Sequence, residues 1–457
     1  MDKREKLSSR IGFIMLSAGC AIGLGNVWRF PFIAGQYGGA LFVLLYLVFL
    51  CIFGIPVMTM EFSVGRASQR SIAESFDVLE PKGTKWHLFS WMGMAGNYLL
   101  MMFYTTIAGW ILYYLFYMLN GTFVGVTAEL SEAIFVSHIG SPVKSLLGMI
   151  IICVLGFGVC TIGLQKGVEK LTKWMMSCLF VVMIVLVVRA VTLPGAEKGL
   201  RFYLMPSLDG IRQHGLWTVI FAAMGQSFFT LSLGVGSMAI FGSYIGKEHR
   251  LAGESVNVTI LDTLVAFLSG LIIFPACFAF DVNPGAGPSL IFVTLPNIFN
   301  EMPAGRLWGV LFFVFMLFAA LSTVIAVFEN IMSFGMDKLG WSRKKSALIN
   351  AVAIILLSVP CALGFNLWSG FQPMGPGSNV LDLEDFIVSN NLLPLGSLVY
   401  LLFCVSKKGW GWENFLAEAN SGKGLSFPRR IKPYLQYGVP VILIAIFIFG
   451  YIEKFFL

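Results

Sequence analysis

Six polar side chains stand inside stretches of sequence that are otherwise apolar, and they are the residues that could bind an ion or a small ligand: Asn26, Thr230, Ser232, Asp262, Ser322 and Thr323. Polar residues within a membrane span are costly, and they often belong to ion or substrate sites. Ser, Thr and Asn also have a simpler use, because they form hydrogen bonds between neighbouring helices. Both interpretations stay open for the uncharged residues.

Asp262 is harder to explain by helix packing alone. It lies in ILDTLVAFLSGLIIFP, where an unpaired carboxylate would be costly. A bound cation is the simplest partner for it. Neutral oxygens with one or two carboxylates suit a hard monovalent ion such as Na⁺ better than a soft transition metal, and no histidine falls within these stretches.

Further charged residues could act at the edges of such a site. Glu61, in PVMTMEF, could accept backbone N–H groups that are left over where a neighbouring helix unwinds. Two charge pairs could close the ends of a pathway, Arg29 with Asp385 in an outer vestibule and Arg4 with Asp337 in an inner one. Spacing along the chain does not show that either pair meets.

The segments that must position these residues are interrupted. Residues 11–36 are long enough to cross a bilayer, but Gly19, Gly23 and Gly25 lie near the middle. Each interior glycine costs a helix about 1 kcal/mol relative to alanine, so three of them favour local unwinding. A second apolar segment carries FFTLSLGVG at 228–236. Backbone groups freed in hydrocarbon need partners, and two interrupted helices are typical of secondary transporters.

Composition places the chain in a lipid bilayer. Of the 457 residues 57% are hydrophobic and 12% charged, with a mean hydropathy of +0.82, which excludes an ordinary soluble domain. The basic opening MDKREKLSSR precedes an apolar run far longer than a signal-peptide core, so we expect it to be retained. The formal charge of +7 comes from short clusters between apolar segments, which topology explains better than nucleic-acid binding. The eight cysteines form no CxxC pair and are interpreted as buried small hydrophobic residues.

Eleven apolar segments are near the length needed to span. They run at approximately 11–36, 40–64, 88–119, 145–162, 174–192, 216–244, 257–280, 308–336, 346–363, 383–405 and 434–452. A cytoplasmic N-terminus puts most Lys and Arg residues in inside loops, so the positive-inside rule supports that orientation, with the C-terminus outside. The loop DVNPGAGPSLIFVTLPNIFNEM, after the seventh segment, is expected to carry a short helix above the vestibule.

These segments predict an all-α polytopic membrane protein with 11 transmembrane helices. Helices 1 and 6 are unwound at mid-membrane, and two five-helix halves form a 5+5 inverted repeat. We expect one transmembrane transporter domain over residues 1–457. Its parts are the first half through the sixth helix at 11–244, helices 7–10 at 257–405 and an extra helix 11 at 434–452.

Enzyme and channel functions have less support. The sequence has no HExxH and no GxSxG motif, and GSYIGK at 242–247 has one residue too few between its glycines for a phosphate-binding loop. We therefore expect no catalysis. A channel needs a continuous filter, whereas the broken segments suggest one enclosed site at the midplane.

The residues around both breaks resemble a known family. GCAIGLGNVWRFP, followed by GGALFVLLYLVFLCIFGIPVMTMEFSVGR, resembles the start of the neurotransmitter:sodium symporters, and GQSFFTLSLGVG resembles their sixth helix. The resemblance covers nearly the whole chain. In length and loops the chain is similar to the bacterial amino-acid transporters of this family that have eleven helices.

The resemblance implies two sodium sites. The first would be formed by the Ala21 carbonyl, Asn26, Thr230, Asp262 and the carboxylate of the substrate. The second would be formed by the carbonyls of Gly19, Ile22 and Ala319 and the hydroxyls of Ser322 and Thr323. Carbonyls of unwound helices supply the oxygen ligands that Na⁺ needs in such transporters.

The resemblance also implies a site for an amino acid. Its carboxylate would meet the amides of Leu24 and Gly25 and the Tyr104 hydroxyl, and its ammonium would meet the carbonyls of Ala21, Phe229 and Thr230. Its side chain would lie among Leu100, Tyr104, Phe229, Ser232, Val235 and Val327. By the same resemblance Arg29 with Asp385 forms the outer gate and Arg4 with Asp337 the inner latch. Glu61 supports the unwound sixth helix.

The chain departs from the family pattern in its helices 1, 5 and 12. Leu7 stands where an aromatic residue often packs the inner gate. Ser177 stands ten residues after Gly167, where the fifth helix of many members has a proline linked to unwinding during inward release. A twelfth helix is missing, so any dimer contact that it makes is unsupported.

The hypothesis that follows is sodium-coupled symport of hydrophobic L-amino acids across the plasma membrane, the inner membrane in bacteria. Leu100, Val235 and Val327 suggest an apolar pocket without a charge for a polar side chain. The alternative is another small amine or amino acid and, with less support, an ion channel. Asp262 stands where chloride-dependent relatives place an asparagine, so chloride is not expected. The sequence leaves open the Na⁺ stoichiometry, proton counter-transport and the oligomeric state.

Overall fold

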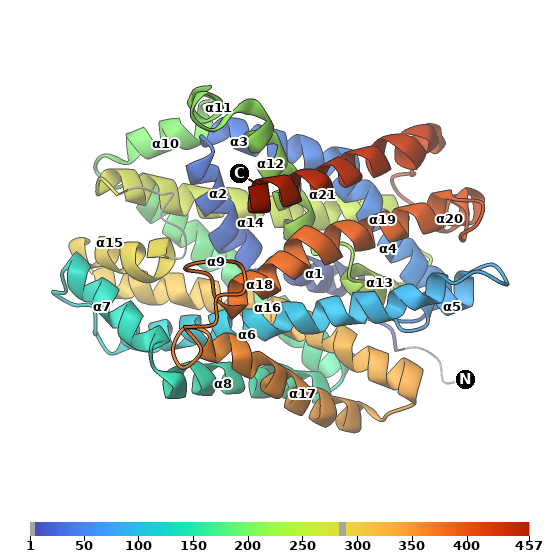
Figure 1. The fold of residues 1–457 in the computed structure, drawn as a ribbon, viewed down its shortest axis with the longest axis horizontal. Coiled ribbons are helices and arrows are strands. Elements are labelled where there is room, and N and C mark those ends of the chain that lie inside the picture. Colours follow the sequence, from blue (N-terminus) through green and yellow to red (C-terminus); the bar gives the residue numbers. More distant parts are fainter. Residues whose placement is uncertain (1–4, 283–288, 457) are drawn as a thin grey trace.

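The computed structural model describes residues 5–282 and 289–456, which are almost entirely helical (Figure 1). Helices of the first part of the chain are α1 (Arg10–Ala21), η1 (Gly25–Arg29), α2 (Phe30–Gln36), α3 (Ala40–Phe49), η2 (Leu50–Gly54), α4 (Ile55–Ser68), α5 (Ser75–Leu79), η3 (Trp86–Leu88), α6 (Phe89–Leu119), α7 (Ala128–Ile139), α8 (Pro142–Thr161), η4 (Leu164–Glu169), α9 (Lys170–Val191), α10 (Ala196–Leu204), α11 (Asp209–His214), α12 (Leu216–Thr230) and α13 (Ser237–Gly242). Extended structure among the described residues is limited to one isolated bridge, between His249 and Lys423.

Helices of the second part are α14 (Leu251–Ala279), η5 (Leu290–Thr294), α15 (Leu295–Glu301), α16 (Gly305–Leu339), α17 (Arg343–Leu363), α18 (Val380–Ile387), η6 (Val388–Leu392), α19 (Leu393–Val405), α20 (Trp412–Ala419), η7 (Arg429–Ile431), η8 (Tyr434–Gly438) and α21 (Val439–Phe456). Six of the η elements are short π-helical segments, which widen the helix locally: η1, η2, η4, η5, η6 and η8. The short helix expected in the loop after the seventh segment is present as η5 and α15.

The membrane-spanning character predicted from composition is confirmed. In the described part of the chain, nine helices are long and apolar enough to cross a bilayer, and α1 with η1–α2 forms a tenth span that is bent by 56°. The expected segment 216–244 is divided into α12 and the short α13. The predicted count of eleven therefore depends on counting both broken segments as spans.

Both predicted breaks are present, and local backbone geometry explains them. Helix α1 ends at Ala21, and Ile22 is extended, with φ −71° and ψ 93°. Helix α12 ends at Thr230, and the next residues include Ser232 at φ +51° and Gly234 at φ +95°. Glycine reaches such positive φ values without a steric penalty. A side chain at Gly234 is excluded for a second reason, because its Cβ would lie 2.2 Å from the Leu393 carbonyl oxygen.

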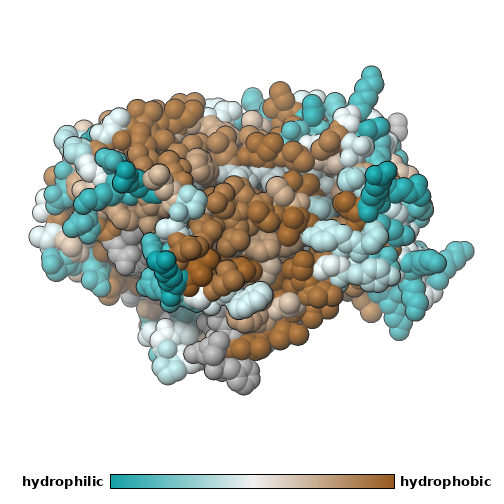
Figure 2. All heavy atoms as spheres, turned by 90° about the horizontal axis from the view of Figure 1, so that it is seen from above, coloured by the Kyte–Doolittle hydropathy of each residue, from teal (hydrophilic) through white to brown (hydrophobic). Residues whose placement is uncertain are grey.

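The surface fits a bilayer with its normal along the long axis of the molecule. Figure 2 shows a broad band of hydrophobic side chains across the middle, with hydrophilic side chains at both ends. Exposed apolar residues such as Val181 on α9, Leu356 on α17 and Val441 on α21 belong to this apolar surface. We name the end that carries the start of α1, α5 and α20 the N-terminal face, and the end that carries α7, α10 and α15 the opposite face (Figure 1).

Helix α16 organises the interior. It packs along α6, α9, α8 and α1, and its residues from Val324 to Gly335 are all buried. Helix α14 packs against α9, α10 and α4 on another side. The two breaks therefore lie inside a shell of continuous helices, where their free backbone groups meet protein rather than lipid.

Candidate functional site

The break in α1 brings an unusual group of oxygen atoms together against α16. The carbonyl oxygens that lie 3.3–3.4 Å from the Thr323 hydroxyl belong to Gly19, Cys20, Ile22 and Ala319. The Ser322 hydroxyl lies 2.9 Å from the Ala319 carbonyl oxygen and 3.5 Å from that of Ile22. One hydroxyl has one hydrogen to donate, so this buried group contains more oxygen lone pairs than donors.

An excess of buried neutral oxygens suits a hard cation, because carbonyl and hydroxyl oxygens are the ligands that such ions prefer. The structure brings together all the residues of the predicted second sodium site: Gly19, Ile22, Ala319, Ser322 and Thr323. The Cys20 carbonyl also belongs to this group, and the sequence offered no means to include it.

The side chains of the predicted first sodium site are hydrogen-bonded to one another. Asp262 Oδ1 accepts a hydrogen bond from Asn26 Nδ2 at 2.8 Å, and Asp262 Oδ2 accepts one from Thr230 Oγ1 at 3.0 Å. All three residues are buried. Ala21, the fourth member, is the last residue of α1, where helix carbonyls lose their intrahelical donors. Asn26 Oδ1 also accepts a hydrogen bond from the Gly23 amide at 3.3 Å, which connects this group of a carboxylate, an amide and a hydroxyl to the break that follows α1.

The predicted amino-acid site lies between the two breaks and α6. The Tyr104 hydroxyl accepts a hydrogen bond from the Leu24 amide at 3.0 Å, so it already touches the backbone that would bind a carboxylate. The Phe229 ring packs on Gly25, where an added Cβ would lie 2.8 Å from the Phe229 Cε1 atom. The Ser232 hydroxyl donates to the Cys20 carbonyl at 3.4 Å.

The remaining members of the predicted site form an apolar set around the same region. Leu100 precedes Tyr104 by one helical turn on α6, and Val327 follows Thr323 by one turn on α16. Val235 lies in the unwound stretch between α12 and α13. All three side chains are buried. These three residues offer apolar contacts and no charge to a substrate side chain.

Two polar side chains hold the unwound sixth helix from opposite sides. Glu61 on α4 accepts a hydrogen bond from the Gly234 amide at 2.5 Å. Asn97 on α6 donates to the Val235 carbonyl at 2.8 Å and accepts from the Ser237 hydroxyl at 3.3 Å. The freed amide and carbonyl groups of this helix are therefore paired within the protein, as a buried break requires.

Sequence reasoning missed Asn97 and also Gln226, whose Nε2 donates to the Gly25 carbonyl at 3.0 Å. Gln226 thereby joins the sixth helix to the first at the break. Both residues are polar and stand in apolar segments, so the criterion that singled out Asn26 would also have found them.

The side of the site toward the opposite face is closed by Arg29. Its guanidinium lies 4.1 Å from the centre of the Phe229 ring, and its Nη1 lies 4.0 Å from Asp385 Oδ1 and 3.2 Å from the Ser389 hydroxyl. Ser389 in turn donates to Asp385 at 2.6 Å. Beyond this pair lies a cavity of about 370 Å³, whose lining includes Phe32, Ile33, Gln36, Phe221, Gln226 and Asn390.

Of the predicted inner latch, only Asp337 can be placed, because Arg4 lies outside the described residues. Asp337 Oδ2 accepts a hydrogen bond from the Ser71 amide at 2.9 Å, and Oδ1 lies 4.0 Å from Arg70 Nη1. Asp337 thus ties α16 to the chain that follows α4.

Two buried carboxylates hold the start of α1 at the N-terminal face. Glu169 accepts a hydrogen bond from the Ser8 amide at 2.8 Å, and Glu254 Oε1 lies 2.9 Å from Arg10 Nε. Glu169 belongs to η4 and Glu254 to α14. These contacts hold the start of α1 at the N-terminal face, and the sequence alone did not indicate them.

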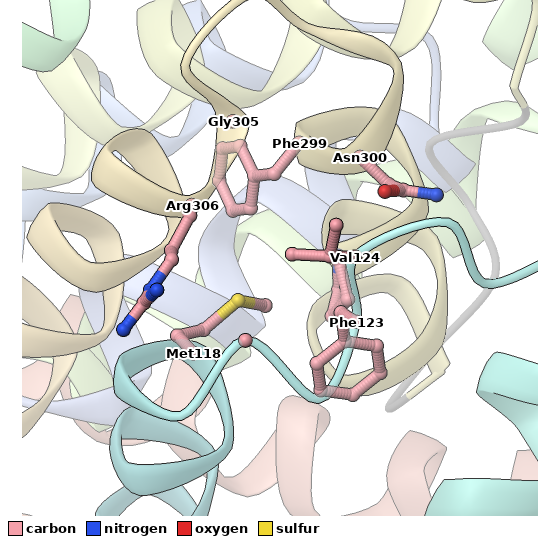
Figure 3. A pocket seen from close by; sticks show the side chains of 9 residues that line it. Met118, Phe123, Val124, Phe299, Asn300, Gly305 and Arg306 are labelled. Carbon is pink, nitrogen blue, oxygen red and sulfur yellow. The ribbon is translucent and has the colours of Figure 1, made fainter.

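A separate cavity lies at the opposite face, away from both breaks (Figure 3). Its lining includes Met118, Phe123, Val124, Phe299, Gly305 and Arg306. Its polar groups are engaged: Asn300 accepts from the Gly125 amide and donates to the Val126 carbonyl, both at 2.9 Å, and Arg306 donates to the Leu119 carbonyl. We do not regard this cavity as a candidate site.

A group of possible metal ligands at the N-terminal face is also engaged. Asp77, Glu80 and His87 lie close together. Lys338 Nζ lies 2.8 Å from Asp77 Oδ2, and His87 Nδ1 lies 2.6 Å from Glu80 Oε1. These pairs account for the cluster without an ion.

The fold and the site together define a class of protein. Two spans are broken inside a shell of helices, and buried oxygens gather at both breaks, which is the construction of a secondary transporter. The chain belongs to the sodium:neurotransmitter symporter family, whose model matches residues 4–124 and 123–454. This family consists of transporters and not of enzymes, and the chain is accordingly a sodium-dependent membrane transporter.

Individual relatives support this assignment over the full chain. The chain is 35% identical to the uncharacterized sodium-dependent transporter YhdH of Bacillus subtilis (strain 168), with 98% of each chain covered. It is 32% identical to an uncharacterized sodium-dependent transporter of Haemophilus influenzae, again with 98% of each covered. Among solved structures, that of MhsT in complex with L-phenylalanine matches with a TM-score of 0.88 and 38% identity, over 97% of this chain and 99% of the other.

Proposed function

We propose that the protein couples the entry of Na⁺ to the symport of hydrophobic L-amino acids across the plasma membrane by alternating access. The single observation that carries this proposal is the pair of buried breaks, where oxygens in excess of donors lie in the same region as the buried apolar residues Leu100, Val235 and Val327. A channel would need an open path, whereas here Arg29 and Phe229 cover one side of the site and the held start of α1 covers the other.

Two Na⁺ ions are assigned to the site. The carbonyl and hydroxyl group around Thr323 would hold one ion, and the end of α1 with Asn26, Thr230 and Asp262 would hold the other. Both groups use atoms of the broken α1, so binding of Na⁺ would favour the arrangement in which α1, α14 and α16 lie together. An ion that binds one arrangement more tightly shifts the population toward it.

The substrate assignment rests on the chemistry of the pocket. The Leu24 and Gly25 amides follow the break in α1, and a helix N-terminus attracts a carboxylate. The Leu24 amide donates to the Tyr104 hydroxyl, so the carboxylate would bind beside this pair. Leu100, Val235 and Val327 offer only apolar contacts to the substrate side chain. The similarity to a transporter solved with L-phenylalanine supports a hydrophobic amino acid.

Transport into proteoliposomes tests this function. Purified protein should accumulate L-phenylalanine or L-leucine when Na⁺ is higher outside than inside. Replacement of external Na⁺ by K⁺ should abolish accumulation, because the Na⁺ gradient is the proposed driving force. Uptake that is unchanged in K⁺ would refute Na⁺ coupling, and a current without substrate would instead favour a channel.

A further inference from the structure

The face of α6 that borders the proposed substrate site carries a residue with no side chain. Gly96, Leu100 and Tyr104 follow one another at intervals of four, which places them on one face of the helix. Tyr104 contacts the Leu24 amide, and Leu100 is assigned to the substrate side chain. Gly96 continues this stripe by one turn toward the N-terminal face.

Gly96 is needed for space. A Cβ atom at this position would lie 2.7 Å from Val235 Cγ1 and 3.5 Å from Leu392 Cδ1. The first distance is shorter than atoms tolerate without moving, and the second is an ordinary contact. Gly96 lies within α6, at an ordinary helical backbone conformation that any residue adopts. The absence of a side chain therefore serves the contact with Val235.

Val235 cannot move back along its own backbone to make room. Its carbonyl accepts the Asn97 hydrogen bond at 2.8 Å, and the preceding Gly234 amide is held by Glu61 at 2.5 Å. The following Gly236 is at φ +76°, and Val235 itself is fully buried. A β-branched side chain has few alternative rotamers, so a methyl group at position 96 would move the Val235 side chain away from α6.

We propose that Gly96 sets the upper size limit of the substrate side chain, because it lets Val235 lie against α6 and leaves the pocket deep enough for a large apolar or aromatic group. Gly96 is a specificity-determining residue that acts through Val235 without touching the substrate. This inference rests on the proposed amino-acid transport and deepens it. The class of ligand that it assigns is a bulky hydrophobic L-amino acid.

The test compares a large substrate with a small one. Na⁺-driven uptake and equilibrium binding of L-tryptophan and L-alanine are measured for wild type and for Gly96→Ala. We expect Gly96→Ala to weaken the binding of L-tryptophan relative to that of L-alanine by roughly 5- to 150-fold. This is the range that overpacking produces in closely packed interiors. Gly158→Ala is the matched control, since Gly158 is also a helical glycine and a Cβ there meets no atom within 4 Å.

A double variant separates the contact from a general packing defect. Gly96→Ala combined with Val235→Ala removes the clash, so it should show the same preference for L-tryptophan over L-alanine as Val235→Ala alone. Val235→Ala is the reference because Val235 itself belongs to the proposed substrate site. If Gly96→Ala alone does not fold, the double variant still should, and it then provides the comparison. A double variant that remains unfolded would overturn the inference.

Other outcomes distinguish this inference from the proposed function. If Gly96→Ala weakens the binding of both substrates equally, without recovery in the double variant, the role of Gly96 is overturned. The proposal of amino-acid transport is not affected by that result. Wild-type protein that takes L-alanine but no aromatic amino acid would do the same. Wild-type and Gly158→Ala proteins that accumulate no amino acid at all would refute the proposed function itself.

Discussion

Asp262 is the residue on which the charge balance of the proposed first sodium site depends. Its two carboxylate oxygens receive hydrogen bonds from Asn26 and Thr230, and it is fully buried. A cation in such a place needs a nearby negative charge, because an uncompensated ion in a low-dielectric interior is very costly. A fixed carboxylate meets that need without a bound anion.

We therefore predict that transport does not require chloride. With gluconate in place of all chloride, Na⁺-driven uptake by wild type should be unchanged. Asp262→Asn keeps the shape of the side chain and removes the charge, so its Na⁺ affinity should fall by roughly 100-fold or more, since the loss of one partner from a buried charge pair costs several kcal/mol. Added chloride should restore part of the uptake in this variant.

Two results would contradict this role of Asp262. Wild type that stalls without chloride would show that an anion is part of the site. Asp262→Asn that transports as well as wild type with no anion present would show that the carboxylate is not the counter-charge. Ser17→Ala, a buried change on α1 outside the proposed ligand set, controls for general damage.

At the scale of elements, glycine placement made the two breaks predictable. Three glycines near the middle of residues 11–36 and the FFTLSLGVG stretch indicated unwinding, and the structure shows it at both places. The extended helices were predictable because long apolar runs leave few other structures in a bilayer. Wide turns such as η2 and η6 were missed, although each ends two residues before a proline, Pro56 and Pro394, and proline has no N–H for the helical hydrogen bond.

Which helix faces which could not be read from the residues alone. Glu61 was expected to support an unwound helix, but its partner Gly234 became known only from the structure. Arg10 with Glu254 and Ser8 with Glu169 are separated by 244 and 161 positions in the chain. Contacts between residues this far apart in the chain are set by tertiary packing. A single sequence does not show which of its residues lie close together in space.

Helix α9 offers a prediction about the departure at Ser177. The wide turn η4 precedes α9, and Ser177 Oγ donates to the Lys173 carbonyl at 2.8 Å. Proline at this position would remove a backbone donor to the same carbonyl and crowd it, which costs about 3 kcal/mol or more in a helix interior. We expect Ser177→Pro to raise amide hydrogen exchange across 164–177.

Ser177→Ala is the control, because it removes only the hydroxyl bond and keeps the backbone donor, so its exchange should match that of wild type. Protection in Ser177→Pro that equals that of wild type would mean that this end of α9 is held by its neighbours and not by its own hydrogen bonds. In that case the serine would not limit unwinding of the helix.

At the scale of the whole molecule, the two ends differ in charge as well as in structure. Basic residues in the loops and helix ends of the N-terminal face include Lys82, Lys85, Lys344, Lys345, Lys407, Lys408, Arg429 and Arg430. Positive charge of this kind is retained on the cytoplasmic side of a membrane. The cavity beyond Arg29 and Asp385 opens at the other end, so it would be the entrance through which Na⁺ and the amino acid arrive from outside.

Thiol labelling on intact cells tests this orientation. Glu129 on α7 and Lys85 before η3 are both exposed, at opposite ends of the molecule, and a charged maleimide does not cross the bilayer. Glu129→Cys should react without permeabilisation and Lys85→Cys only after it. Wild type gives the background, since its most exposed cysteine, Cys51, lies within a membrane-spanning helix, where a charged reagent is disfavoured. The reverse pattern would place the Arg29–Asp385 pair on the cytoplasmic side. Substrate entering the cell would then pass the start of α1 first and the Arg29–Asp385 pair last, the opposite order to that proposed.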